Sequence, residues 1–281
     1  MNKPFKYFLF LLFLLAASNN SFAQDALQRQ FEYAKKLYQE ERYYDSITEF
    51  KRLLFFDGNN HYGYIANEYI GKSYKMGAKF SDAIRYFVYA EINAATFDEL
   101  YTAKINIIRA NILRRTTDRA LDLLDSLQTG KQFSSKLREI YYWKGWAYIF
   151  ADKWGKAAGT FSKTDSSRAL EYFCKKVDSE KYSVSFAEIL SHFIPGAGQF
   201  YTGHYLSGLL SLGWNVLWGY FTINAFIANR TFDGLAIANF LWLRFYNGNL
   251  QNSRKFAEEE NLKISNKALD YLQFDFPGAK P

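Results

Sequence analysis

The spacing of apolar residues changes character along this chain. From residue 24 to 182, small and aromatic residues recur three and four positions apart, which brings their side chains onto one face of a helix. From Tyr205 to Asn229 the chain then runs for 25 residues without a charged side chain. Both patterns are typical of helices, so the sequence predicts an all-α fold.

A repeat of 37 residues underlies the first region. Ser46 and Ala83 are 37 residues apart, Ala157 follows after a further 74, and Ala120 occupies the step between them. A small residue lets two helices approach closely while aromatic residues fill the groove to the next unit, so the repeat predicts about four stacked helical hairpins. The other matching positions are Ala34, Gly71 and Gly145; Leu37, Tyr74 and Tyr148; Tyr43, Phe80 and Trp154; and Phe50, Phe87 and Phe161.

Over residues 24–164 this pattern resembles the tetratricopeptide repeat (TPR), an α-solenoid family whose unit has about 34 residues. The resemblance implies a concave groove, lined by the first helix of each hairpin, that binds peptides or partner proteins. The third unit departs most, with Asn111 and Thr117 where other units carry aromatic residues. A further helix, Ser166–Ser179, is expected to close a repeat domain of residues 24–182, with Cys174 as a small buried hydrophobe.

Basic residues recur on the predicted groove. Lys35, Lys72 and Arg109 share one first-helix position at 37-residue steps, Lys75 lies one turn from Lys72, and Trp146 ends the series. They predict a basic ladder, with an apolar wall at its end, suited to an acidic segment of a partner protein. Alternatively, these residues only solvate exposed helix faces. Residues 24–182 hold 26 basic and 21 acidic residues, a mixture that excludes a nucleic-acid surface.

The first 23 residues have the layout of a secretory signal peptide. Lys3 and Lys6 precede the apolar run Phe8–Ala17, and the small residues Ser21 and Ala23 lie just before Gln24. An uncleaved anchor is the alternative, although the run is shorter than the roughly 20 residues that a membrane span needs. The segment indicates a bacterial protein that works outside the cytoplasm.

Residues 183–250 contain only four charged residues, Glu188, Arg230, Asp233 and Arg244. The uncharged segment Tyr205–Asn229 is long enough for a hydrocarbon core of roughly 30 Å at about 1.5 Å per residue. With a second apolar segment, Gly234–Leu250, it predicts a C-terminal transmembrane helical hairpin that turns at Arg230–Asp233. The alternative is a buried hydrophobic hairpin in a soluble domain.

Small residues form a stripe along the first arm of this hairpin, where close helix contact is expected. Gly234 and Ala238 are expected to face it. Val184–Ile194 has one apolar face and predicts an amphipathic helix at the membrane interface that stops at Pro195. The stripe consists of Gly203, Ser207, Ser211, Asn215 and Gly219.

Residues 186–261 resemble a small membrane module of bacterial envelope proteins, often found behind TPRs and distantly like two-transmembrane-helix domains. The resemblance implies a location rather than an activity, and Gln199, Asn249 and Asn261 are expected to cap and join helices. Residues 251–281 predict a short amphipathic helix and a loose tail. The matching residues are Pro195, Gly196, Gly198, Gln199, Tyr201, Gly203, Gly208, Phe245, Tyr246, Gly248, Asn249, Ala257 and Asn261.

The sequence predicts no enzyme, no cofactor and no metal. The three histidines fit no metal-binding motif, and the glycines after Pro195 match no nucleotide-binding loop. One cysteine excludes an internal disulfide. Glu188 and His192, four residues apart, offer an acid–base pair, but a simple surface pair is the preferred interpretation.

We therefore expect a membrane-tethered scaffold at the bacterial inner membrane, with its repeat domain in the periplasm. It would bind a protein or acidic peptide in the groove and membrane lipid through the hairpin, with a role in envelope or membrane-protein assembly. The alternative is an accessory subunit of a membrane transport or lipid-handling system, and a membrane enzyme is a third class. The net charge of +7 divides into +2 on residues 1–23 and +5 on residues 24–182.

Overall fold

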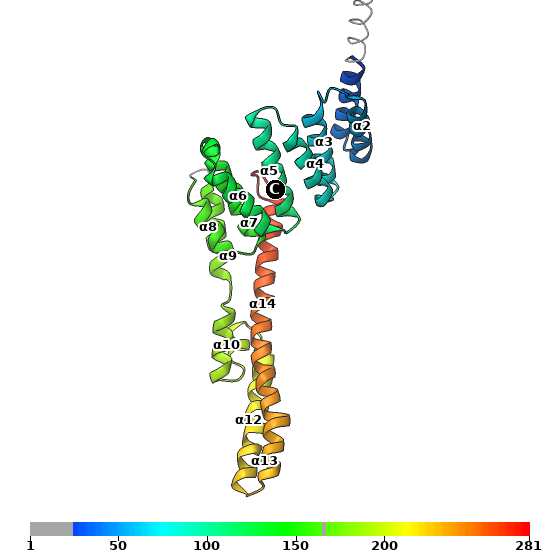
Figure 1. Cartoon of the computed structure of the whole chain (residues 1–281). Coiled ribbons are helices and arrows are strands. Elements are labelled where there is room, and N and C mark those ends of the chain that lie inside the picture. Colours follow the sequence, from blue (N-terminus) through cyan, green and yellow to red (C-terminus); the bar gives the residue numbers. More distant parts are fainter. Residues whose placement is uncertain (1–24, 165–166) are drawn as a thin grey trace, which may run out of the picture. The chain divides into compact units, whose positions relative to one another are not determined.

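The computed structural model describes residues 25–164 and 167–281, and in these ranges the regular structure is entirely helical. The predicted signal peptide, residues 1–23, lies outside the described residues. The chain divides into two compact units (Figure 1). The repeat unit ends at Arg168, and the hairpin unit comprises Ala169–Lys280.

Four helical hairpins make up the repeat unit, which confirms the predicted all-α architecture of repeated hairpins. A short 3₁₀ helix, η1 (Lys131–Lys136), links the third to the fourth. The pairs are a helix over residues 25–39 with α2 (Tyr43–Phe56); α3 (Gly63–Met76) with α4 (Phe80–Ile92); α5 (Phe97–Leu113) with α6 (Thr117–Thr129); and α7 (Leu137–Phe150) with α8 (Trp154–Phe161).

The turn inside each hairpin repeats with the same 37-residue period. A residue in the left-handed region occupies it every time: Glu41 (φ 60°), Ala78 (φ 55°), Arg115 (φ 65°) and Asp152 (φ 60°). The next amide closes the turn over the helix end, as when Lys79 N–H donates to the Tyr74 carbonyl at 2.9 Å. Arg115 keeps this geometry, so the third unit holds the common register despite its missing aromatics.

Within each hairpin, a small residue on the first helix receives an aromatic ring from the second. A Cβ placed on Gly71 would lie 2.6 Å from the Phe87 ring, and one on Gly145 would lie 2.4 Å from the Phe161 ring. Both rings are fully buried, as is Phe50 in the first hairpin. The repeat pattern therefore marks the places where two helices touch.

The hairpin unit contains α9 (Arg168–Glu180), α10 (Val184–Phe193), α11 (Ala197–Tyr201), α12 (Tyr205–Ile227), α13 (Thr231–Ile237), a π-helical turn η3 (Ala238–Trp242) and α14 (Leu243–Phe274). Instead of closing the repeat stack as expected, α9 belongs to this unit, where Phe173 packs on Tyr271 of α14 at 4.9 Å. Cys174 of α9 is buried, as expected, and this burial raises the pKa of its thiol to about 12.

The predicted hairpin of residues 205–250 forms, with its turn at Ala228–Arg230 and an Arg230–Asp233 ion pair beside it at 3.5 Å. Its second arm is not one helix: α13 and η3 lead into α14, which continues without a break through the region expected to hold a short helix and tail. In Figure 1, α14 runs alongside α10 and α12, in agreement with their contacts.

The prediction that this hairpin spans a membrane with two helices is not supported. Among the helices of residues 25–164 and 167–281, none combines the length and the apolar character needed to cross a bilayer. The physical reason lies in the stripe itself, because Ser207, Ser211, Asn215 and Gly219 lower the mean hydropathy of α12. In the second arm the apolar run is divided between α13, η3 and the start of a charged helix.

Gly145→Ala and Gly159→Ala separate close packing from helix propensity within the fourth repeat. The methyl group of alanine at position 145 would overlap the Phe161 ring, so we expect a loss of about 1–3 kcal/mol in the free energy of unfolding. Gly159 has open space around its added Cβ, so alanine there should stabilise α8 by up to about 1 kcal/mol. Chemical denaturation of the full chain measures both; equal effects would contradict the packing interpretation.

Candidate functional site

The predicted basic ladder lies on the first helices of the repeats, but its members have different surroundings. Lys35 lies near the Phe31 ring, with its ammonium 5.9 Å from the ring centre. Lys72 is neutralised by Glu68, a buried carboxylate on the same helix, at 2.8 Å. Glu68 and Lys72 are four residues apart on α3, a spacing that favours an ion pair on a helix. The prediction of a basic ladder did not consider it.

Lys75 is a cation of the groove without a counterion. Its side chain is half-buried and makes no hydrogen bond or ion pair in the described structure. Burial, followed by repulsion from Arg109 and Lys72, lowers its pKa to about 8. An ammonium group held in these surroundings favours an incoming carboxylate, because pairing offsets the loss of hydration.

Arg109 of α5 is positioned by α7. Its guanidinium lies over the Trp143 ring, 4.8 Å from the centre, and interacts electrostatically with Glu139. Burial lowers its pKa, although the group stays charged. The Trp143 indole in turn donates to Glu139 at 3.2 Å. Sequence reasoning missed Trp143 and Glu139, since neither occupies the repeated ladder position.

Trp146, the predicted apolar end of the ladder, does not form an exposed wall. Only 2% of it is exposed, and it packs between Tyr142 and Phe150. The expectation for Trp146 was wrong because its helix position faces the core in the fourth repeat. The groove is therefore a mixed surface in which Lys75 and Arg109 carry the positive charge.

A second candidate site is a buried polar network in the hairpin unit, centred on Asn249 of α14. The Asn249 side-chain carbonyl accepts from Gly196 N–H at 2.7 Å, from Ser211 Oγ at 2.9 Å and from Gln199 Nε2 at 3.1 Å. Its amide donates to the Ser191 carbonyl at 3.0 Å. One side chain thus joins four segments, and Gln199 and Asn249 join helices as expected.

Glycines allow the motif after Pro195 to pack this tightly. Pro195 follows the end of α10, and Gly196 (φ 92°) lies against the backbone of Gly208, where a Cβ would come within 2.3 Å of the carbonyl oxygen. A Cβ on Gly198 would meet the Ala187 carbonyl at 2.3 Å. Gly203 adopts φ 80° at the turn into α12. Only glycine fits these positions without rearrangement.

The remaining motif residues hold the ends of this network. Tyr246 OH donates to the His192 carbonyl at 2.9 Å, and Tyr201 OH accepts from Ser183 N–H at 3.2 Å. Asn261 pairs with both backbone groups of Tyr182, at 2.8 and 2.9 Å. Gly248, in contrast, has open space where a Cβ would lie, so nothing in the structure explains its choice.

Asn215 lies in a lateral pocket of about 370 Å³ between α12 and α14. Its amide donates to the Ser211 carbonyl on its own helix and not across the hairpin. Its carbonyl oxygen accepts no hydrogen bond. The rings of Trp214 and Phe245 stack beside it at 5.4 Å, and Arg244 lies on the rim. The stripe nevertheless faces the second arm, since Gly219 lies against Trp242.

The acid–base pair that Glu188 and His192 offered does not form. His192 bonds the backbone carbonyl of Glu188 at 2.9 Å instead of its carboxylate. That carboxylate lies 3.9 Å from Arg254. Among residues 25–164 and 167–281, no three acidic, histidine or cysteine side chains cluster as metal ligands.

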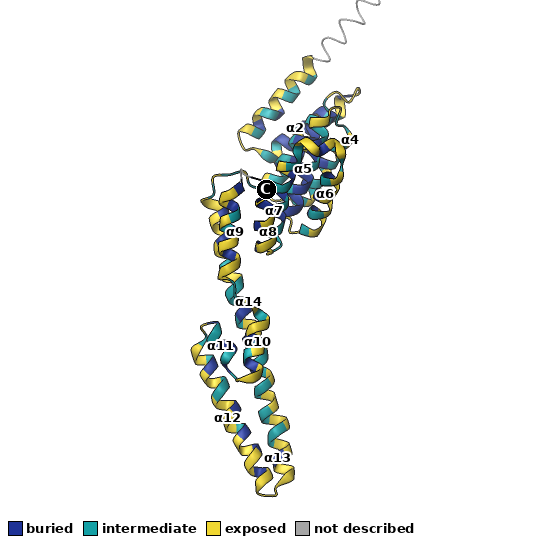
Figure 2. Ribbon diagram, turned by 90° about the vertical axis from the view of Figure 1, so that its left-hand side faces the viewer, coloured by how far each residue is buried: buried dark blue, intermediate teal, exposed yellow. Residues whose placement is uncertain are grey.

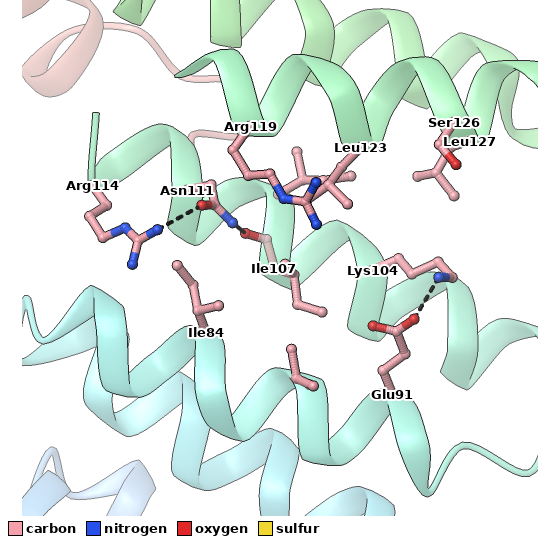
Figure 3. A pocket seen from close by; sticks show the side chains of 12 residues that line it. Ile84, Glu91, Lys104, Ile107, Asn111, Arg114, Arg119, Leu123, Ser126 and Leu127 are labelled. Atoms are coloured by element: carbon pink, nitrogen blue, oxygen red, sulfur yellow. Dashed lines mark hydrogen bonds and ion pairs between the residues drawn. The ribbon is translucent and has the colours of Figure 1, made fainter. Parts of the chain in front are cut away.

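The repeat unit also holds a pocket of about 330 Å³ between α4, α5 and α6 (Figure 3). Apolar side chains including Ile84, Ile107 and Leu123 line it. The Glu91–Lys104 ion pair, at 2.5 Å, closes one end, and Arg119 extends from α6 beside Leu123. No sequence prediction included this pocket, although Asn111, one of its lining residues, was the noted departure from the repeat.

Comparison with known proteins yields no match to a family model, a curated protein or a solved structure. The function of the groove, the polar network and the pockets therefore has to be inferred from their geometry.

Asn249→Ala tests whether the polar network holds the hairpin unit together. The change leaves the buried Gly196 N–H without its acceptor, at about 1–3 kcal/mol, and removes one of the two acceptors of the Gln199 amide, so we expect a loss of about 2–4 kcal/mol. Hydrogen exchange of residues 196–211 in the full chain should accelerate accordingly. Asn239→Ala, which removes only an exposed bond to Leu235, is the control; equal exchange in both variants would rule out the hub role.

Proposed function

We propose that this protein is a membrane-associated adaptor without catalytic activity, in which the repeats recruit a protein partner and the hairpin holds the molecule on lipid. The observation that carries the proposal is that the two units have opposite polarity. One has an apolar core, and the other has a small and polar interior beneath an apolar exterior.

The interior of the repeat unit is that of a water-soluble solenoid. Its fully buried side chains include Phe50, Phe87, Trp154 and Phe161. Burying such groups removes apolar area from water at about 25 cal/mol per Å², which stabilises the stacked hairpins. The hydrophobic effect in water is therefore sufficient to explain how this unit folds.

Between residues 184 and 260 of the hairpin unit, the buried side chains are small or polar and the large apolar side chains are exposed. The only buried apolar side chains in this range are Ala187, Ala225 and Ala257, whereas Gln199, Asn215 and Asn249 are buried. Along α12 and α13, isolated buried positions interrupt helices that are otherwise exposed (Figure 2). The exposed side chains of α12 include Leu206, Leu209, Leu210, Val216, Leu217, Phe221, Ile223, Phe226 and Ile227.

Helices that meet through small and polar residues while presenting large apolar ones outward are suited to lipid, where apolar surface needs no burial. In water the same surface would favour aggregation. This supports seating the hairpin in the apolar part of a membrane.

The groove supports an acidic partner. Lys75 and Arg109 lie on adjacent first helices and repel one another, while Glu68 is already paired with Lys72. A carboxylate bound between the two cations would relieve this repulsion and accept charge-assisted hydrogen bonds. We assign the groove to an acidic segment of a protein, with no role for nucleic acid or a cofactor.

One observation favours the second candidate, an accessory subunit of a membrane transport or lipid-handling system. The Asn215 carbonyl is buried without a hydrogen-bond donor and faces a lateral pocket. In a simple anchor this group only costs stability. Asn215→Leu, which leaves the Ser211–Asn249 hydrogen bond in place, should preserve membrane binding and complementation of a deletion strain in an adaptor, but should abolish complementation if the hairpin handles a substrate.

Liposome flotation tests the membrane assignment. Leu209, Val216 and Ile223 are each more than half exposed on α12, and glutamine at all three should reduce the floated fraction at least tenfold by removing apolar contact with lipid. The matched control replaces Tyr44, Phe55 and Ile92, exposed side chains of the repeat unit, by glutamine. If the control lowers flotation as much as the α12 variant, the hairpin is not the membrane-binding part.

The pH dependence of partner capture tests the groove. The Lys75 pKa is lowered to about 8, so Lys75 is mostly charged at pH 7 and mostly neutral at pH 9. Affinity for an acidic peptide such as hexaglutamate should therefore fall up to about tenfold between these values. Lys75→Arg should bind at both pH values, because arginine stays charged.

Two further variants complete the groove test. Lys75→Glu should abolish binding of the acidic peptide, while Lys79→Glu, at the exposed end of the same hairpin turn, changes the net charge equally and should retain most of it. Equal losses in these two variants would show a general charge effect and remove the groove assignment.

A further inference from the structure

The pocket between α4, α5 and α6 occupies a joint that the preceding repeat fills with its own side chains. There, Tyr74 of α3 stacks on Tyr86 of α4 with ring centres 5.4 Å apart. Lys51 of α2 covers both rings and donates to Tyr74 OH at 3.2 Å. Two phenol rings and an ammonium group thus close the joint between the first and second repeats.

The equivalent positions 37 residues later are Val88, Asn111 and Leu123, and all three line the pocket. Because these side chains are shorter than those of Lys51, Tyr74 and Tyr86, the volume that the two tyrosine rings occupy in the preceding joint stays open. Asn111 does not reach across it, because its amide donates to the Ile107 carbonyl on its own helix at 2.8 Å. The cavity of about 330 Å³ therefore arises from the missing aromatics of the third repeat.

The mouth of this pocket carries positive charge without a counterion. Arg119 is exposed and makes no hydrogen bond or ion pair in the described structure. Arg114 donates only to neutral oxygens, those of Ser81, Asn111 and Thr116. The one carboxylate of the lining, Glu91, is already engaged by Lys104 (Figure 3).

We propose that this repeat-joint pocket binds an aromatic side chain of a partner protein, with a neighbouring carboxylate of that partner on Arg119. The ring restores the packing that Tyr74 and Tyr86 provide one repeat earlier, and the carboxylate supplies the missing counterion. The lining of the pocket includes neither Lys75 nor Arg109, so the pocket is separate from the groove and does not depend on the role proposed there.

The full chain and blocked dipeptides test this assignment by ligand-observed NMR. Tyr-Glu with both ends blocked carries the ring and the carboxylate; Tyr-Gln lacks the charge, and Ala-Glu lacks the ring. We expect Tyr-Glu to bind about fivefold more tightly than Tyr-Gln and at least tenfold more tightly than Ala-Glu. Equal binding of the three peptides would overturn the proposal, and so would tighter binding of free N-acetyltyrosine, which would assign the pocket to a small aromatic acid.

The preceding joint supplies the blocking variant. Asn111→Tyr with Leu123→Tyr rebuilds the ring pair inside the pocket and should reduce Tyr-Glu binding at least tenfold while raising the melting temperature. Arg119→Gln, a surface change that leaves the fold intact, should weaken Tyr-Glu about fivefold without affecting Tyr-Gln. Arg85→Gln, on α4 but outside the lining, is its control.

These variants also separate this site from the groove. Lys75→Glu should leave Tyr-Glu binding unchanged, and the ring-pair variant should still capture hexaglutamate. Unchanged Tyr-Glu binding in the ring-pair variant would refute the pocket assignment whatever the groove does. If that variant does not fold, an Arg119→Gln chain that binds Tyr-Glu as the wild type does refutes it equally.

Discussion

Several helix pairings in the described residues depend on the absence of a side chain at the point where two helices touch. In the repeats, the Phe87 ring occupies the place where a Gly71 side chain would lie, and Phe161 does the same at Gly145. In the hairpin unit, Gly196 lies on the backbone of Gly208 and Gly219 lies against Trp242. The same device therefore serves two surroundings. In the repeats the space receives aromatic rings, while around Gly196 and Gly208 it lets backbones approach, so that hydrogen bonds replace apolar burial.

The sequence specified the repeat architecture well because the period is written in small and aromatic residues that pack on one another. Asn111 and Thr117 broke that pattern, yet the third hairpin keeps its register. Its turn depends on the backbone at Arg115 and on a hydrogen bond from Thr116 to Asn111, features that residue types do not reveal. A residue that departs from the repeat pattern thus need not change the fold. In the third repeat, the missing aromatic side chains leave a pocket instead.

The candidate sites were harder to predict, since their properties come from neighbours distant in sequence. Lys72 and Lys75 are one turn apart, but only Lys72 has a carboxylate partner, and Trp146 turns to the core at a position that is partly exposed in α3. The polar motif after Pro195 was predicted to join helices and does so through Asn249, about 50 residues later. The sequence did not reveal which face of each helix in the hairpin unit is covered, because hydropathy along the chain records only the average of the covered and uncovered faces.

The continuity of α14 has a mechanical consequence. One helix of 32 residues, about 48 Å at 1.5 Å per residue, begins beside the small-residue stripe of α12 and reaches the contact of Tyr271 with Phe173 of α9. An α-helix twists and bends far less readily than a loop, and α14 contains no proline to kink it. The contact of α14 with the small-residue stripe and its contact with α9 are therefore held apart by one continuous helix rather than by a loop.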